Sequence, residues 1–276
     1  MQAQKVVYLE VNVISVAADP YPLVIAHRGG GDEAPENSFT AFSAMHELGV
    51  RYIETDAHLT ADDVVVLNHD EVIDRTYDGE GRISEMTYEE ICQYRNSAGE
   101  TMPRLVDALE SFPELFWNID AKSDDVVDPL LEILAEREAF GRVLLASFSE
   151  KRLNRIRDCE EPELTTSLGV PAVVRLMLAS ETVSAAETWR VDGPHQHVRA
   201  VQVPEKMKGI RVVNPRFVAT AHTAGLAVHV WTVNEPDAMV RLLDWRVDGL
   251  ITDRPTMLRE ILKARGQWRD PQPMEA

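Results

Sequence analysis

The chain has 276 residues, of which 45% are hydrophobic and 27% are charged, as is usual for a soluble globular protein of one large or two small domains. This composition excludes a disordered chain and a collagen-like repeat, and two cysteines are too few for a disulfide scaffold. The 46 acidic side chains outnumber the 28 basic ones, and the net charge of −18 repels nucleic acids and anionic surfaces at long range. We therefore expect no nucleic-acid partner.

The N-terminal region has none of the features of a targeting segment. Residues 1–20 carry apolar patches that polar residues interrupt, so they lack the continuous apolar region of a signal peptide. No apolar run approaches the ~20 residues that a membrane-spanning helix requires. Cys92 and Cys159 lie in no metal or redox motif, which is typical of a reducing compartment. The sequence predicts a cytoplasmic protein with no integral membrane segment, an N-terminal extension over residues 1–20 and a main domain over residues 21–265.

Short β-branched apolar runs alternate with longer amphipathic ones along the chain. The short runs predict strands at Leu23–Ala26, Arg51–His58, Leu115–Ala121, Arg142–Ser147, Leu164–Gly169, Arg199–Val203, Leu226–Thr232 and Val247–Ile251. The longer runs predict helices at Ser38–Leu48, Pro103–Ser111, Val126–Glu138, Glu150–Asp158, Pro171–Glu181, Pro215–Ala224, Pro236–Asp244 and Pro255–Lys263. Several of these helices begin with proline, which is preferred at the first helical position.

Strands that alternate with helices indicate parallel β-α units of the α/β class. Eight such units in about 250 residues match a (β/α)8 TIM barrel, although a doubly wound open sheet remains the competing architecture. One segment, residues 69–101, interrupts the alternation after the second strand and is rich in charged residues and glycine. Because the loops that follow barrel strands build the active site, we expect this small insertion at the C-terminal face.

Polar side chains with catalytic potential end the first two predicted strands. His27 and Arg28 end the first strand, and the glycines after them allow backbone to approach a ligand closely. Glu54 and Asp56 are two residues apart on the second strand, so both project from the same face. Two carboxylates buried there without a partner would be costly, and a divalent cation would neutralise both.

Further polar groups follow later apolar runs. His69 comes just after residues 64–67, and a second histidine beside a carboxylate pair suits acid/base catalysis at a metal site. Asp120 and Lys122 share a strand face, where they could serve a metal and an anion, form a structural salt bridge, or do both. Trp231 ends the seventh strand, where it either walls a pocket or fills the core. All-oxygen ligation favours Mg²⁺ or Ca²⁺ over Zn²⁺.

Nine short motifs are spread along the chain, at Ala26–Gly29, Pro35–Ser38, Glu54–Asp56, Asn68–Asp70, Asp74–Thr76, Asp120–Lys122, Ser147–Phe148, Trp231–Asn234 and Asp248–Asp253. Taken together, these motifs resemble the glycerophosphodiester phosphodiesterase family over essentially residues 23–262. The resemblance implies a barrel with a small insertion after the second strand. It also implies metal-dependent hydrolysis of small-molecule glycerophosphodiesters to glycerol 3-phosphate and an alcohol.

The resemblance also implies a role for individual residues. The family's catalytic histidines correspond to His27 and His69, its metal-binding acids to Glu54, Asp56 and Asp120, and its phosphate-contacting cations to Arg28 and Lys122. The third acid is usually glutamate in this family, and Asp120 is shorter by one methylene, about 1.5 Å. A metal would therefore sit deeper, be bridged by water, or be held more weakly.

Two other functions stay open. A phospholipase D-like activity on lysophospholipids or sphingomyelin would require an exposed apolar rim on the βα loops, and no strongly apolar loop stands out. A non-catalytic barrel that only binds its ligand is disfavoured, because both histidines and all three acids are present.

Overall fold

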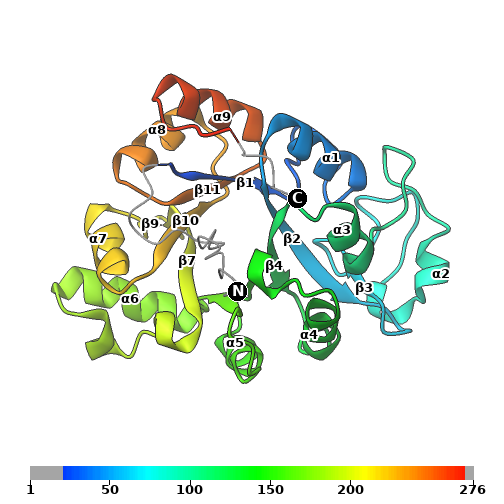
Figure 1. Ribbon diagram of the computed structural model, residues 1–276, viewed down its shortest axis with the longest axis horizontal. Coiled ribbons are helices and arrows are strands. Elements are labelled where there is room, and N and C mark those ends of the chain that lie inside the picture. Colours follow the sequence, from blue (N-terminus) through cyan, green and yellow to red (C-terminus); the bar gives the residue numbers. More distant parts are fainter. Residues whose placement is uncertain (1–20, 271–276) are drawn as a thin grey trace, which may run out of the picture.

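The computed structural model describes residues 21–270, and its centre is a closed barrel of parallel strands (Figure 1). Around the barrel lie β1 (Leu23–His27), β2 (Tyr52–Leu59), β4 (Phe116–Ala121), β5 (Val143–Ala146), β6 (Thr165–Ser167), β7 (Val198–Pro204), β10 (Ala227–Trp231) and β11 (Gly249–Thr252). Because β1 pairs with β2 on one side and with β11 on the other, the sheet is closed, which rules out the open doubly wound sheet. The predicted (β/α)8 barrel is therefore confirmed.

Helices form the outer ring of the barrel (Figure 1). They are α1 (Phe39–Leu48), α3 (Leu105–Ser111), α4 (Val127–Glu136), α5 (Glu150–Arg157), α6 (Val170–Thr182), α7 (Pro215–Thr223), α8 (Pro236–Asp244) and α9 (Pro255–Ala264). Each predicted helix and strand is present, with ends that differ by two residues or fewer. At α7, for example, the Asn214 side-chain oxygen accepts hydrogen bonds from the backbone N–H groups of Arg216 and Phe217 (2.9 and 3.0 Å). The predicted extension over residues 1–20 lies outside the described residues, and the domain boundaries stay a prediction.

Apolar side chains fill the space between strands and helices. Phe42 of α1 meets Trp117 of β4 edge to face, with ring centroids 5.0 Å apart, and both side chains are buried. A separate small cluster of Leu144, Ala200 and Ala227 comes from near the N-terminal ends of β5, β7 and β10. The N-terminal end of the barrel is thus apolar, which leaves the C-terminal ends of the strands for polar side chains.

One buried histidine of β10 makes stability depend on pH. His229 is 2% exposed, and its Nε2 has no hydrogen-bond partner within the described chain. Burial lowers the pKa of His229 from 6.5 to about 4. Between these two values the unfolded chain binds a proton that the folded chain does not, so stability falls as the pH drops through this window.

We expect acidification from pH 7 to pH 4.5 to cost about 2–3 kcal/mol through His229 alone. In the His229→Gln variant this part of the pH dependence should be absent. Urea unfolding of both proteins at the two pH values measures the difference. The same loss of unfolding free energy in the variant and in the wild type would contradict the assignment.

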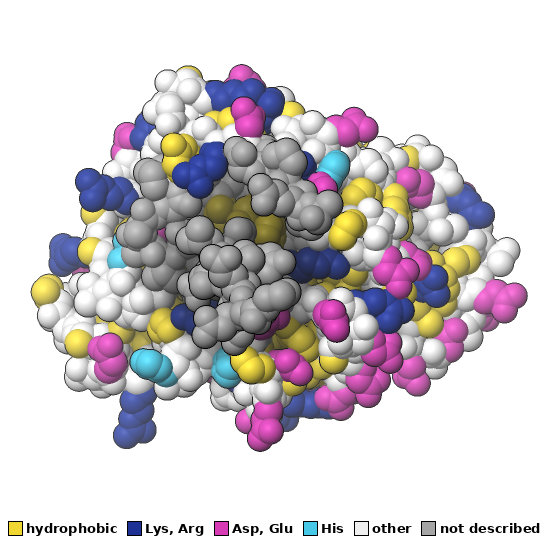
Figure 2. All heavy atoms as spheres, in the orientation of Figure 1, with side chains coloured by type: hydrophobic (Ala, Val, Ile, Leu, Met, Phe, Trp, Pro, Cys, Tyr) yellow, Lys and Arg dark blue, Asp and Glu magenta, His cyan; other side chains and the backbone are white. Residues whose placement is uncertain are grey.

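The segment predicted to be irregular forms a small lobe beside β2 (Figure 1). It contains β3 (Val65–Leu67), which pairs antiparallel with β2 and was not predicted as a strand, and the short helix α2 (Tyr88–Ile91). The lobe has its own buried cluster, formed by Val66, Ile73, Tyr77, Ile83, Ile91 and Met102. Because this cluster orders the chain on both sides of His69, the loop that carries the histidine is anchored. Acidic side chains gather on the side of the molecule that carries α2 and α4 (Figure 2).

A small hairpin that was also not predicted lies between β7 and α7. Its two strands, β8 (Lys206–Met207) and β9 (Ile210–Arg211), pair antiparallel. Both residues of the connecting turn, Lys208 and Gly209, have positive φ angles (50° and 82°), as a tight type I′ turn requires. Within residues 21–270, no helix combines the length and the apolar character needed to cross a bilayer.

Candidate active site

The parallel register of three strands brings polar residues together at one end of the barrel. His27 of β1 is the register partner of Glu54 of β2, and Asp56 of β2 is the register partner of Asp120 of β4. A cavity of about 490 Å³ opens beside them, and its size is typical of a small-molecule site. Its lining includes every residue predicted for the site: His27, Arg28, Glu54, Asp56, His69, Asp120, Lys122 and Trp231. The structure thus brings all of them together, while their individual roles stay predictions.

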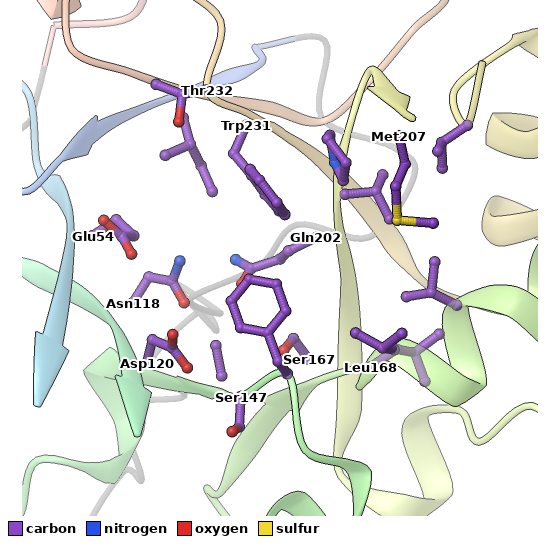
Figure 3. Close-up of a pocket in the computed structure, with 18 of the residues that line it drawn as sticks. Glu54, Asn118, Asp120, Ser147, Ser167, Leu168, Gln202, Met207, Trp231 and Thr232 are labelled. Atoms are coloured by element: carbon purple, nitrogen blue, oxygen red, sulfur yellow. The ribbon is translucent and has the colours of Figure 1, made fainter. Parts of the chain in front are cut away.

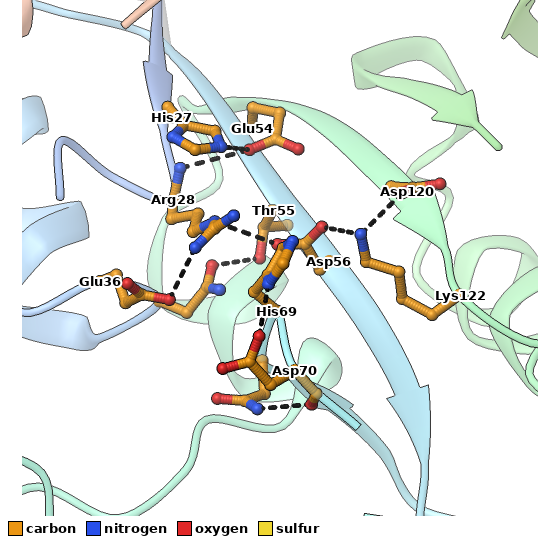
Figure 4. Close-up of polar contacts among 12 residues, drawn as sticks. His27, Arg28, Glu36, Glu54, Thr55, Asp56, His69, Asp70, Asp120 and Lys122 are labelled. Carbon is orange, nitrogen blue, oxygen red and sulfur yellow. Dashed lines mark hydrogen bonds and ion pairs between the residues drawn. The ribbon is translucent and has the colours of Figure 1, made fainter. Parts of the chain in front are cut away.

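A tight turn after β1 places Arg28 among the carboxylates. Arg28 has a φ of 53°, which is uncommon outside glycine, and its backbone N–H donates to Glu54 Oε2 at 3.3 Å. Its guanidinium lies between Asp56 (Nε to Oδ2, 3.6 Å) and Glu36 (Nη1 to Oε1, 3.1 Å), as Figure 4 shows. Gly30 follows with a φ of 90°, and a Cβ there would lie 2.9 Å from the Pro255 ring. The turn therefore needs glycine at this position.

A carboxylate orients His27. The Nδ1 atom of His27 lies 2.6 Å from Asp253 Oδ1, and Asn234 donates to the other Asp253 oxygen at 2.7 Å. Because Asp253 binds Nδ1, the other ring nitrogen, Nε2, remains available on the cavity side, where it lies 3.9 Å from Glu54 Oε2. Burial lowers the His27 pKa, but the hydrogen bond to Asp253 and the charge of Glu54 outweigh it and leave that pKa raised.

His69 is held in a similar way from the other side of the site (Figure 4). Its Nδ1 lies 2.7 Å from Asp70 Oδ1, and the second Asp70 oxygen accepts from Arg75 Nε at 2.6 Å. Arg75 also donates to both Glu36 oxygens (2.7 and 2.8 Å), and Glu36 in turn binds Arg28. A continuous chain of charged hydrogen bonds therefore connects the loop of His69 with the turn of Arg28.

Three carboxylates share the polar end of the cavity with Lys122. The Lys122 ammonium lies 2.6 Å from Asp56 Oδ1 and 2.8 Å from Asp120 Oδ2, so the predicted structural salt bridge is present. Burial lowers the Lys122 pKa, but the charges of Asp120 and Asp56 outweigh it and keep the ammonium charged. Burial and then the charge of Asp56 raise the pKa of Glu54 to about 8.

This cluster has an excess of negative charge that suits a divalent cation. When Glu54 is ionised, as it would be beside a bound cation, the three carboxylates outnumber the two cations, Arg28 and Lys122, by one charge, and a monoanionic phosphodiester would bring the excess to two. Two carboxylate oxygens, Asp56 Oδ2 and Asp120 Oδ1, are buried without a hydrogen-bond partner. Within residues 21–270, however, no three His, Cys, Asp or Glu side chains are arranged closely enough to hold a metal as they stand. The donor chemistry therefore fits Mg²⁺ or Ca²⁺, and a shift of the Lys122 ammonium would free the two aspartates.

The opposite wall of the cavity is apolar. In Figure 3, Glu54, Asn118 and Asp120 lie on one side, whereas Leu168 and Met207 lie on the other. Trp231 and Phe148 meet edge to face with ring centroids 5.9 Å apart, and Phe148 is 60% exposed. The expectation that the loops carry no strongly apolar rim is therefore wrong. Its residues are dispersed in sequence over β5-α5, α6 and the β8–β9 hairpin, so no single run signalled them.

Several residues of the site were given no role from the sequence. Asn118 lies two residues before Asp120, so it shares the same strand face and could have been found from that spacing. Asp70 directly follows His69, so its position in the sequence could have identified it as a partner of the histidine. Asp253 is 226 residues from His27 in sequence, and no local pattern links the two.

Replacing Asp253 by asparagine is expected to lower kcat about 10- to 100-fold with little change in KM, because an orienting partner of a general acid or base is weakened. The pH-profile limb that reports His27 should move to lower pH, because the carboxylate charge that raises its pKa is gone. Asp244→Asn, on α8 and paired with Arg265, is the matched control. An unchanged profile in Asp253→Asn would show that Asp253 does not act through His27.

Trp231→Ala is expected to lower kcat/KM at least about ten-fold while leaving most of the stability intact, because the half-buried ring lines the cavity. The buried core residue Trp117 is the matched control, and Trp117→Ala should lose about 3–5 kcal/mol of unfolding free energy. Urea unfolding and steady-state kinetics measure both variants. A Trp231→Ala variant with normal turnover and a loss as large as that of Trp117→Ala would assign Trp231 to the core.

Comparison with known proteins places the chain in a family. A family model described as the glycerophosphoryl diester phosphodiesterase family matches residues 27–257. The chain is 36% identical over 247 residues to a Mycobacterium tuberculosis protein named "Probable glycerophosphodiester phosphodiesterase 2", which covers 89% of this chain and 92% of that protein. It is 30% identical over 258 residues to a glycerophosphodiester phosphodiesterase of Caldanaerobacter subterraneus, with 88% of this chain and 99% of that protein covered.

The fold is shared with solved structures. A phosphodiesterase of Oleispira antarctica, determined in complex with the product sn-glycerol-3-phosphate, superposes with a TM-score of 0.72 at 22% identity, over 88% of this chain and 97% of that one. Together with the closed barrel, the sequence matches show that the chain belongs to the glycerophosphoryl diester phosphodiesterase family and is a hydrolase of glycerophosphodiesters.

Proposed function

We propose that this enzyme cleaves glycerophosphodiesters to glycerol 3-phosphate and an alcohol, with a divalent cation and with His27 and His69 as the proton-transfer groups. The observation that carries the proposal is the pair of histidines at one cavity, each with Nδ1 held by a carboxylate. The product sn-glycerol-3-phosphate bound to the Oleispira antarctica phosphodiesterase supports the product assignment.

Proton transfer is assigned to the Nε2 atoms. Because Asp253 and Asp70 occupy the Nδ1 atoms, each ring keeps Nε2 for exchange with a ligand in the cavity. One imidazole takes the proton of the attacking hydroxyl, and the other protonates the oxygen of the departing alcohol. In the family pattern the attacker is the glycerol 2-hydroxyl, so a cyclic phosphate forms first and water then opens it.

Phosphate binding is assigned to the two cations of the site. Arg28 and Lys122 line the cavity and are held by carboxylates, which limits their movement. They offset the phosphodiester charge locally, in a chain whose overall charge is strongly negative. Glu54, Asp56 and Asp120 would hold a divalent cation, which when bound stabilises the charge that develops on the phosphoryl oxygens.

The proposal is tested by incubating the enzyme with glycerophosphocholine and measuring release of glycerol 3-phosphate and choline. We expect both products in equal amounts with Mg²⁺ or Ca²⁺, and none after exhaustive treatment with EDTA. Phosphocholine and glycerol as the products would place the cleavage on the wrong phosphoester bond. Full activity in metal-free enzyme would remove the cation from the proposal.

The phospholipase D-like alternative is a second candidate, favoured by the apolar wall of the cavity. The same bond is cleaved in a lysophospholipid, and Leu168, Val173 and Met177 would contact its acyl chain. In a comparison of choline release, Phe148→Ala should then impair hydrolysis of lysophosphatidylcholine more than that of glycerophosphocholine. Equal effects on both substrates, or no hydrolysis of the lysolipid, would leave the water-soluble diester as the substrate.

The cytoplasmic location predicted from cysteine usage stays a prediction. Cys92 and Cys159 are both half-buried and unpaired with one another. Fractionation of the producing cells, with an antibody against the chain, tests it directly.

A further inference from the structure

The hairpin between β7 and α7 carries exposed basic and apolar side chains at the mouth of the cavity. Its exposed residues are Lys206, Met207, Lys208, Ile210 and Arg211. Ile210 is 65% exposed. The adjacent Glu205 is engaged by Arg241 at 2.9 Å, and no carboxylate in residues 21–270 pairs with Lys206 or Lys208. Among residues 21–270 this hairpin is thus a local concentration of positive charge without a paired carboxylate, with Arg211 lying over the Trp245 ring at 5.3 Å, in a chain of net charge −18.

An apolar stripe on α6 borders the same cavity. Val170, Val174 and Leu178 are four residues apart, so they lie on one face of the helix, and they are 42–45% exposed. The opposite face of α6 packs on the barrel through Leu176 and its neighbours. Val170 and Val174 line the cavity together with residues 206–208 of the hairpin, so the stripe and the hairpin border one mouth.

We propose that these elements form a docking face for the surface of an anionic lipid bilayer. The docking face consists of Phe148, Val170, Val174, Leu178 and hairpin residues 206–211. Exposed apolar side chains beside cations are the combination that binds the headgroup region, because the apolar groups enter it and the cations meet anionic lipids. The inference goes beyond the proposed function, because it concerns where the enzyme works and not which bond it cleaves.

The negative charge of the whole chain does not prevent such binding. Charges are screened over about 8 Å at physiological ionic strength, so a bilayer at the hairpin responds mainly to Lys206, Lys208 and Arg211. Many acidic side chains gather instead on the side that carries α2 and α4 (Figure 2). A second copy of the chain is the weaker candidate for the same face, because a two-fold contact would bring the cations of one hairpin against the same cations of its mate.

Co-sedimentation of the full chain with vesicles tests the proposal. We expect binding to vesicles of phosphatidylcholine and phosphatidylglycerol, weaker binding to pure phosphatidylcholine, and a decrease in high salt. Each cation near such a surface raises the partition coefficient about five-fold, so Lys208→Glu should lower it by at least that factor. Lys263→Glu, an equal charge change at an exposed position in the last turn of α9, should have little effect.

The apolar part of the docking face is tested by Ile210→Glu and Leu178→Glu, with Val240→Glu on α8 as the matched control. Neither Ile210 nor Leu178 lines the cavity, so both variants should hydrolyse glycerophosphocholine normally and unfold at the wild-type temperature while losing vesicle binding. The proposal is overturned if the wild type binds no vesicle, or if the control variants lose binding as strongly. A dimer that Ile210→Glu dissociates would likewise overturn it. Vesicle binding by an enzyme that cleaves no diester would refute the proposed function alone.

Discussion

Replacing His27 or His69 by alanine is expected to lower the single-turnover rate of glycerophosphocholine hydrolysis by about 100-fold or more, the usual contribution of a general acid or base. Substrate affinity should change little, because the proposed phosphate-binding residues Arg28 and Lys122 are unchanged and keep their carboxylate partners. The double variant should lose much less than the product of the two single losses, because both groups serve one proton-transfer cycle. The wild-type pH profile should be bell-shaped, with limbs that belong to the pair of histidines.

A substrate with a better leaving group distinguishes the roles of the two histidines. A nitrophenyl ester needs less protonation of its departing oxygen, so it should rescue the variant that lacks the general acid and leave the other impaired. His46→Ala is the matched control, because His46 lies on α1, is 40% exposed and pairs with Glu114 outside the cavity. Wild-type rates in both His27→Ala and His69→Ala would remove the histidines from the chemistry and restore the binding-module alternative.

Removing the divalent cation, or one of its proposed ligands, is also expected to have a large effect on hydrolysis. Exhaustive chelation should abolish hydrolysis, and Asp56→Asn should weaken Mg²⁺ or Ca²⁺ binding by at least about 10- to 100-fold, the loss typical of a perturbed metal site. Calorimetric titration of the metal measures this without reliance on activity. Asp128→Asn, on α4 and paired with Arg155, is the matched control.

Glu54→Gln should raise the stability of the metal-free enzyme but reduce the stability that the enzyme gains from metal binding. Without metal, the raised pKa of Glu54 means that folding at neutral pH has to protonate this carboxylate, whereas glutamine needs no proton, so the variant should unfold at a higher temperature than the wild type. With metal in excess, the wild type gains stability by ligand binding, and the variant should gain less. A variant that is destabilised equally with and without metal would contradict a role for Glu54 at the cation.

Replacing Asp120 by glutamate, the residue usual in the family, tests whether the shorter side chain weakens metal binding. Asp120→Glu should increase metal affinity if the carboxylate is a direct ligand that now falls short by about 1.5 Å. The Lys122 ammonium, 2.8 Å from Asp120, competes for the same oxygen, so the gain depends on its release. Unchanged affinity would mean that Asp120 contacts the cation only through other groups.

Short-range patterns were enough to predict most of the fold. Short β-branched apolar runs mark the barrel strands and longer amphipathic runs mark the helices, and α6, α7, α8 and α9 also have proline in their first turn. Burial and helix initiation are local requirements of the chain. The strand β3 was missed because its apolar run is followed by the irregular segment and not by a helical pattern, whereas the predicted strands were those that alternate with helices. The β8–β9 hairpin was missed because its two-residue strands carry polar and apolar residues in no helical or strand period that a short window can separate.

The sequence by itself determined the succession of β-α units and the set of residues at the polar end of the barrel, because these residues lie on or just after apolar runs and parallel strands end at one face. Closure of the sheet was decided only by the pairing of β1 with β11, which joins residues far apart in the chain. The same pairing brings Asp253 to His27. The placement of α6 and of the β8–β9 hairpin beside the barrel joins Leu168, Val174 and Met207 into an apolar wall. Such contacts depend on where strands and loops meet in space, and spacing along the chain carries no information about that meeting.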